Sequence, residues 1–256
     1  MNTRVAASLV AVSLALLSPA GTAFAAERQA CEIPSYLLFG SNELKHVTEA
    51  VTKQRRLTIA VVGTGSSILT GPDGPTTAYP ARLEAALKAR LPGVAVKVVT
   101  LVRTRMTAED LAQGMAKLLV DEKPDLVIWQ TGTLDAIRRI EPDSFRAALE
   151  AGVDTLHRGG ADVILMNMQY SPRTDTMVPL GPYADNMRVV AQQFEVPLFD
   201  RLAIMRHWSD TGAFDLYAAG KDNVLAHRVH DCIGRAIAAL IVDAAHLRPS
   251  DLKAGQ

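Results

Sequence analysis

The sequence has no excess of either charge, only two cysteines, and no long apolar run after its first 25 residues. Its 27 lysines and arginines balance 27 aspartates and glutamates, and neither sign forms a long block. Because proteins that bind nucleic acid or membrane surfaces usually carry a charged block or patch, we expect neither partner. Later segments are too polar to cross a bilayer, which takes about 20 apolar residues. Internal repeats, low-complexity tracts and linkers are also absent, so we expect one soluble domain.

The first 25 residues are typical of a secretory signal peptide. Arg4 precedes an apolar run from Val5 to Leu17, and Ala23-Phe24-Ala25 has the small residues of a cleavage site. That run is too short for a transmembrane anchor. We therefore predict export to the periplasm or the medium, with no membrane segment after cleavage of residues 1–25. The mature chain would comprise an arm and helix at 26–55, an α/β domain at 56–248 and a tail at 249–256.

The two cysteines, Cys31 and Cys232, are far apart in the chain. In an exported protein such a pair more often forms a disulfide than remains as two thiols. We predict a bond between them that ties the N-terminal arm to the last helix. A bond that closes a loop of about 200 residues lowers the chain entropy of the unfolded state, and we expect this to stabilise the fold by about a few kcal/mol. Two buried thiols are the alternative.

Five short apolar segments alternate with longer amphipathic ones. Segments that are apolar nearly throughout are typical of parallel strands covered on both faces. The predicted strands are 57–62, 94–100, 125–130, 162–167 and 196–200, and the predicted helices are 78–92, 107–121, 143–158, 182–194 and 222–245. This alternation predicts a doubly wound α/β domain, in which ligands bind outside the carboxyl ends of the strands.

The loop after the first predicted strand reads "GTGSSILTGPDGPTT". It is rich in glycine, yet it matches neither G-x-G-x-x-G nor G-x-x-x-x-G-K-[ST], so a phosphate-binding loop is not indicated. A serine at a strand end can act as a nucleophile, because backbone N–H groups of the following turn can hold an oxyanion. Such a serine can equally well cap a helix.

Two segments resemble sequence blocks of the SGNH (GDSL-type) hydrolases. "GSSILTG" aligns Gly65, Ser67 and Gly71 with the first block, and "WQTGTLDA" aligns Gly132 and Asp135 with a block that reads Gly-x-Asn-Asp. The resemblance covers residues 55–245 or so. It implies a three-layer α/β/α fold of flavodoxin-like type, with a mainly parallel five-stranded sheet. It also implies ester hydrolysis or acyl transfer without a cofactor.

The resemblance makes Ser67 the nucleophile, with Ser66 the less favoured candidate. Two features depart from the family pattern: the turn "LVRTRMT", which contains Thr104, has no glycine, and Leu134 replaces the oxyanion asparagine. A leucine side chain donates no hydrogen bond, and losing one such donor typically costs ~10²- to 10³-fold in rate. The side chains that could substitute are Gln130, Thr131, Thr133, Arg103 and Arg105.

The family's Asp-x-x-His block is missing before the last predicted helix. His230 and His227 are the candidates for the base, His230 first, with Asp222 or Asp231 as the carboxylate that orients it. The same two histidines lack a third convergent ligand, so we predict no metal site.

Gln169 and Tyr170 follow the fourth predicted strand and suit substrate binding. The full set of candidates for binding the oxyanion or the substrate is Ser66, Thr104, Gly132, Thr133, Asp135, Gln169 and Tyr170. The sequence thus predicts an exported esterase or acyltransferase that acts on an acyl ester, either an O-acetylated glycan or a lipid. The alternative is a catalytically degenerate protein of the same fold that binds a glycan or a protein partner.

Overall fold

The computed structural model describes residues 31–39, 42–218 and 223–248. The predicted signal peptide, the predicted tail at 249–256 and Asp222 lie outside these ranges. No helix within the described ranges is long and apolar enough to span a bilayer.

One sheet forms the centre of the molecule, in the strand order β1-β6-β5-β4-β2-β3. Its strands are β1 (Leu38–Phe39), β2 (Arg56–Gly63), β3 (Ala95–Val102), β4 (Leu126–Gln130), β5 (Asp162–Met166) and β6 (Leu198–Phe199). From β6 to β3 all neighbouring strands pair in parallel. Every residue of β4 and β5 is buried, because helices cover both faces of the sheet.

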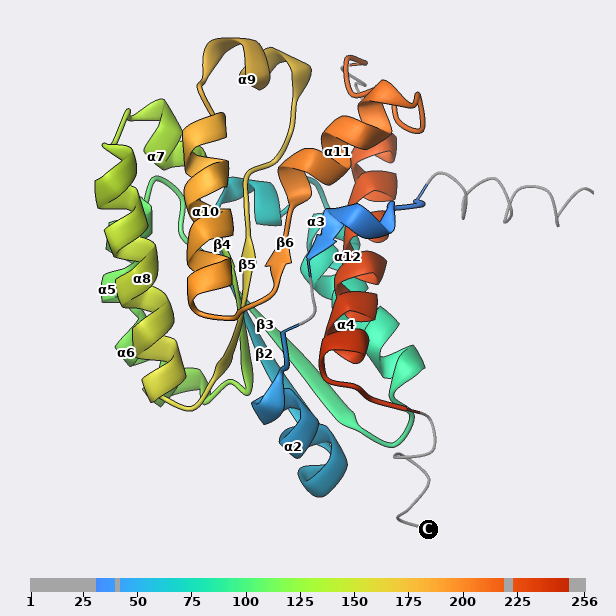
Figure 1. Ribbon diagram of the computed structural model, residues 1–256. Coiled ribbons are helices and arrows are strands. Elements are labelled where there is room, and N and C mark those ends of the chain that lie inside the picture. Colours follow the sequence, from blue (N-terminus) through green and yellow to red (C-terminus); the bar gives the residue numbers. More distant parts are fainter. Residues whose placement is uncertain (1–30, 40–41, 219–222, 249–256) are drawn as a thin grey trace, which may run out of the picture.

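The helices lie in two layers, as Figure 1 shows. α5, α6, α8 and α10 cover one face of the sheet, α4 and α12 pack together on the other, and α2 lies by the amino ends of the central strands. The helix bounds are α2 (Lys45–Gln54), α3 (Gly74–Thr77), α4 (Tyr79–Arg90), α5 (Ala108–Gln113), α6 (Met115–Glu122), α7 (Thr133–Ile137), α8 (Pro142–Arg158), α9 (Pro172–Met177), α10 (Gly181–Gln193), α11 (Arg201–Asp210) and α12 (Val224–Ala244). Two short 3-10 turns, η1 (Ser35–Leu37) and η2 (Gly65–Ser67), complete the order. The predicted three-layer α/β/α class is confirmed.

The sequence prediction was wrong in three details. The single helix expected at 107–121 is two helices, which meet at Gly114. The fifth predicted strand contributes only Leu198–Phe199 to the sheet. A sixth strand, β1, pairs antiparallel with β6; its two residues have too short a pattern to be detected in sequence.

The predicted disulfide is present between Cys31 and Cys232, with their Cα atoms 5.2 Å apart. It ties the segment before η1 to the middle of α12, across 201 positions of sequence. The predicted pairing, and the elements it was expected to join, are confirmed.

Candidate active site

A pocket of about 370 Å³ opens at the carboxyl ends of the parallel strands. The turns after β2, β3, β4 and β5 each contribute to its wall, as expected for a doubly wound sheet. Six of the lining residues carry hydroxyl groups: Thr64, Ser66, Thr104, Thr133, Ser171 and Thr174. Leu134 and Ile137 form an apolar part of the wall, and Gln169 and Arg105 add an amide and a guanidinium. No histidine, aspartate or glutamate is among the described residues that line it.

The two serines of η2 have different surroundings. Ser66 lines the pocket, whereas Ser67 is fully buried. The Ser67 hydroxyl lies 3.1 Å from the Tyr79 hydroxyl and donates a short hydrogen bond to Oε1 of Gln130. An amide oxygen accepts a hydrogen bond but does not remove the proton, so this contact orients Ser67 without activating it. Of the two serines, Ser66 is therefore the one that lines the pocket.

Gln130, at the end of β4, links both serines. Its Nε2 donates to Oγ of Ser66 at 2.9 Å and to Oγ1 of Thr64 at 3.2 Å. Its Oε1 accepts from Ser67 and from the backbone N–H of Thr64. The side chain is fully buried and all its hydrogen-bonding groups have partners, so it fixes the turn in one conformation.

Gly63, the last residue of β2, makes this arrangement possible. A Cβ at this position would lie 2.1 Å from Oγ of Ser67. Any side chain at position 63 would therefore collide with the Ser67 hydroxyl, so glycine is needed at this position.

Arg201, the first residue of α11, lies behind the pocket wall. Its Nη1 donates to the carbonyl oxygen and to Oγ of Ser66, each at 3.2 Å, and its Nη2 donates to Oε1 of Gln169 at 3.1 Å. The guanidinium also lies over the ring of Tyr79, 5.7 Å from its centroid. Arg201 is fully buried, and its Nε has no hydrogen-bond partner in the described structure. Burial lowers its pKa to about 10, so it remains a cation at neutral pH.

Arg201 is not among the site residues predicted from the sequence. The signal that could have found it is position: Arg201 directly follows Asp200 at the end of the fifth predicted strand, where ligand-binding residues of such folds occur.

His230, the first candidate for the base, is buried on α12. Its Nδ1 accepts a hydrogen bond from the backbone N–H of Tyr79 at 3.0 Å. Burial, helped by the nearby Arg201 and His227, lowers the pKa of His230 to about 3. A neutral imidazole whose Nδ1 accepts must carry its proton on Nε2, so in this tautomer Nε2 is a donor. The geometry does not bring His230 to either serine by a hydrogen bond.

His227 is half-buried, one turn before His230 on the same helix. Within the described part of the chain, no side-chain hydrogen bond holds its imidazole. Asn223 Nδ2 donates to the carbonyl oxygen of Thr70 at 2.9 Å, so the start of α12 lies against the loop that follows the two serines.

The remaining predicted site residues divide into two groups. Thr104, Thr133 and Gln169 line the pocket. Gly132, Asp135 and Tyr170 lie outside its lining. Asp135 is buried and accepts from the backbone N–H of Ala108 at 2.9 Å, at the start of α5; burial raises its pKa.

Gly132 and Tyr170 also have packing roles. Gly132 has φ of 102°, and a Cβ there would lie 2.5 Å from Sδ of Met168. Tyr170 is buried, with the Arg206 guanidinium 5.3 Å from the centroid of its ring.

Of the five residues that could replace the missing oxyanion donor, Thr133 and Arg105 line the pocket. Both donors of Gln130 are already used within η2 and its flank, and the hydroxyl of Thr131 is buried. Arg103 lines a different pocket.

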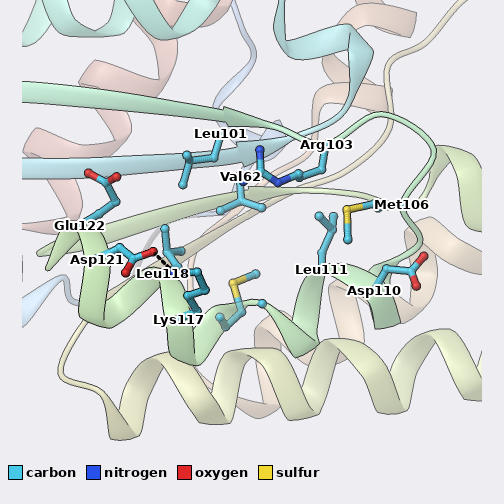
Figure 2. A pocket seen from close by; sticks show the side chains of 12 residues that line it. Val62, Leu101, Arg103, Met106, Asp110, Leu111, Lys117, Leu118, Asp121 and Glu122 are labelled. Carbon is cyan, nitrogen blue, oxygen red and sulfur yellow. Dashed lines mark hydrogen bonds and ion pairs between the residues drawn. The ribbon is translucent and has the colours of Figure 1, made fainter.

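A second pocket, of about 260 Å³, lies between the β3 edge and helices α5 and α6. Figure 2 shows its mostly apolar floor, with Leu101, Leu111 and Leu118 pointing inward, and an ion pair between Lys117 and Asp121 at its rim. Arg103 and Met106 border this second pocket, whereas Thr104 and Arg105 of the same turn border the first. It has no serine, threonine or histidine in its lining, so we assign the chemistry to the first pocket.

No group of three or more histidine, cysteine, aspartate or glutamate side chains in the described ranges is placed to hold a metal ion.

A model of the Non-GDSL lipase-like family matches residues 30–247. The chain belongs to this family. The family membership agrees with the SGNH (GDSL-type) resemblance and with the expected class of ester-bond hydrolase. A search among curated proteins finds no match to the chain.

Solved structures similar to this family member confirm the fold. A catalytic mutant of Axe2, an acetylxylan esterase from Geobacillus stearothermophilus, is 17% identical with a TM-score of 0.56, and the match covers 75% of this chain and 95% of that one. LAE5, an alpha/beta hydrolase enzyme from the metagenome of Lake Arreo, Spain, is 22% identical with a TM-score of 0.55, over 74% and 95% of the two chains. A two-domain esterase active on acetylated mannans is 14% identical with a TM-score of 0.66, over 84% of this chain and 58% of that one.

Proposed function

We propose that this chain is an exported ester hydrolase that cleaves an acyl ester of a glycan in the pocket at the carboxyl ends of the strands. The observation that carries the proposal is the position of Ser66. Ser66 lines the pocket, and its hydroxyl accepts hydrogen bonds from Gln130 and from the cationic Arg201. Both donors stabilise negative charge on Oγ, which favours the serine as a nucleophile. The acetylxylan and acetylated-mannan esterases among the similar folds support a glycan ester as substrate.

In this proposal Ser66 Oγ attacks the ester carbonyl while a base takes the serine proton, and the carbonyl oxygen takes the negative charge. The C–O bond to the alcohol then breaks, and the alcohol leaves with the proton that the base returns. Water then cleaves the acyl-serine and releases the acid. Thr133 and Arg105 are the pocket residues placed to donate to the oxyanion. His227 replaces His230 as the first candidate for the proton acceptor, because the Nδ1 of His230 already accepts a backbone N–H. Asp222 stays a candidate for the carboxylate.

Export is supported by the predicted signal peptide and by the disulfide, because disulfides persist mainly in oxidising compartments. The apolar part of the wall, Leu134 and Ile137, suits a short acyl group such as acetyl.

The second candidate function is binding of a glycan or protein partner without catalysis. One observation favours it: the described pocket lining has no imidazole or carboxylate to take the serine proton.

The test is hydrolysis of short-chain p-nitrophenyl esters, with labelling by a serine-reactive fluorophosphonate, for the mature protein, Ser66→Ala and Ser67→Ala. We expect Ser66→Ala to abolish labelling and to lower kcat/KM by about 10⁴-fold or more, the usual effect of removing a nucleophile. Ser67→Ala should retain labelling.

Loss of labelling in a folded Ser67→Ala protein alone would restore Ser67 as the nucleophile. Absence of labelling and turnover in all three folded proteins would favour the binding function. Circular dichroism of each variant checks that it is folded.

A further inference from the structure

Three arginines lie in the lining of the proposed active-site pocket or in contact with residues that line it. Arg105 lines it, and Nη2 of Arg138 donates to the carbonyl oxygen of Arg105 at 3.2 Å, which places a second guanidinium beside the same turn. Arg201 lies behind the wall and reaches the pocket through Ser66 and Gln169. None of the three forms an ion pair with a carboxylate within the described ranges.

The acidic groups near the pocket are engaged elsewhere. Asp110 accepts from the backbone N–H and the hydroxyl of Thr107, at 2.8 and 2.9 Å, and it is the acidic neighbour of Arg138, whose charge helps to lower the pKa of Asp110. Asp175 pairs with Arg206 at 2.7 Å. Asp135 is buried outside the pocket lining, and its Oδ1 accepts from the backbone N–H of Ala108. Among the described residues that line the pocket, the one charged side chain is therefore the cation Arg105.

Arg201 is the unusual member of these arginines, because it is fully buried and has no carboxylate as a hydrogen-bond partner in the described structure. A fully buried cation normally has a carboxylate beside it, because taking an unpaired charge out of water is costly. Here all three of its hydrogen bonds go to neutral oxygens, of Ser66 and Gln169, and its Nε has none in the described structure. Ser66 and Gln169 line the pocket and contact Arg201. An anion bound in the pocket would therefore lie near Arg201 and would supply the negative charge that Arg201 lacks.

The polar wall suits the same ligand. Six residues with a hydroxyl group and one with an amide line a pocket of about 370 Å³, and groups of these kinds can donate hydrogen bonds to the oxygen atoms of an anion. Arg105 is exposed, so its guanidinium can reach a ligand at the rim.

We infer that this pocket selects an ester that carries an anionic group, the carboxylate of an acidic glycan, with Arg105 as the direct contact and Arg201 as the positioning residue behind Ser66. The inference rests on the proposed function for the site, and adds the charge of the substrate. A phosphate group offers the same chemistry, so the test must separate the two sources.

Binding is measured on the Ser66→Ala protein, in which the proposed nucleophile is absent, by isothermal titration calorimetry. The probes are trigalacturonic acid, its fully methyl-esterified form, and inorganic phosphate. We expect the acid to bind at least tenfold more tightly than its neutral ester, with weaker binding of phosphate. Adding Arg105→Gln should remove most of this preference, and raising the salt concentration should reduce it.

The matched control is Arg90→Gln, in the last turn of α4, which ends near the start of β3, away from the strand ends that form the pocket. It should leave the preference unchanged. Equal affinity for acid and neutral ester, or a preference that survives Arg105→Gln, would overturn the inference. Tighter binding of phosphate than of trigalacturonic acid would overturn the carboxylate assignment and indicate a phosphorylated ligand.

These outcomes are separate from the test of catalysis. A protein that hydrolyses neutral p-nitrophenyl esters but shows no preference for the acid would keep the proposed function and lose the inference. A preference for the acid without any turnover would keep the anion site and support the binding function.

Discussion

Ser66 and Ser67 are adjacent in the chain, yet their hydroxyls serve different purposes. The buried Ser67 hydroxyl contacts Tyr79 and Gln130, whereas Ser66 lines the pocket. The hydrogen bond from Ser67 to Gln130 leaves Nε2 of Gln130 directed at Ser66. Ser67 thus orients the neighbour that we propose as the nucleophile.

This difference predicts different stabilities for the two alanine variants. Ser67→Ala leaves the buried Oε1 of Gln130 without its strongest donor, which should cost about 1–3 kcal/mol of unfolding free energy. Ser66→Ala should cost less, about 0.5–1 kcal/mol, because water in the pocket can replace the lost oxygen and Arg201 keeps the Ser66 carbonyl. Urea unfolding of both variants measures the difference. Equal losses would show that the two hydroxyls have similar surroundings.

Helix α2 depends on a carboxylate from another element. Asp162, at the start of β5, accepts from the backbone N–H of Val47 at 2.9 Å, in the first turn of the helix. The positive N-terminal end of a helix stabilises such an anion. Burial outweighs this effect and raises the pKa of Asp162 to about 6, despite the nearby His46.

A raised pKa predicts that Asp162 costs stability at neutral pH. The folded state binds the proton more tightly than the unfolded state, so the contribution is fully present below pH 3.8 and is lost as the pH rises through about 6. Asp162→Asn keeps an oxygen acceptor but has no charge. Its stability relative to the wild type should therefore rise by about 3 kcal/mol between pH 3.5 and pH 8. Urea unfolding at several pH values measures this, and a constant difference would contradict the assignment.

In the whole molecule, the Cys31–Cys232 disulfide connects the first described residues to the last helix. Because it closes a loop of about 200 residues, removing it should lower the unfolding free energy by about 3–5 kcal/mol. The double variant Cys31→Ser, Cys232→Ser is compared with wild type by urea unfolding, with and without a reducing agent. Reduction should destabilise the wild type and leave the variant unchanged. A wild type insensitive to reduction under denaturing conditions would argue against the bond.

The layer architecture could be predicted from the sequence because it depends on local patterns. The four longest strands lie within one or two residues of their predicted positions, because their segments are mostly apolar, even in the edge strand β3, which is only partly buried. The break at Gly114 was missed because α5 and α6 both turn apolar residues to the core, so the pattern continues across it. The disulfide followed from the count of two cysteines and the predicted oxidising compartment.

The site could be predicted only in part. The sequence put the serine pair, Thr104, Thr133 and Gln169 at the edge of the sheet where the pocket lies. It could not tell which serine faces the ligand, because that depends on Gln130 and Arg201, which are 64 and 135 positions away from Ser66. The same holds for His230, whose ring is held by the backbone of Tyr79, 151 positions away. Local pattern specifies strands and helices, whereas side-chain direction in a turn is set by contacts that exist only after the sheet and its layers have assembled.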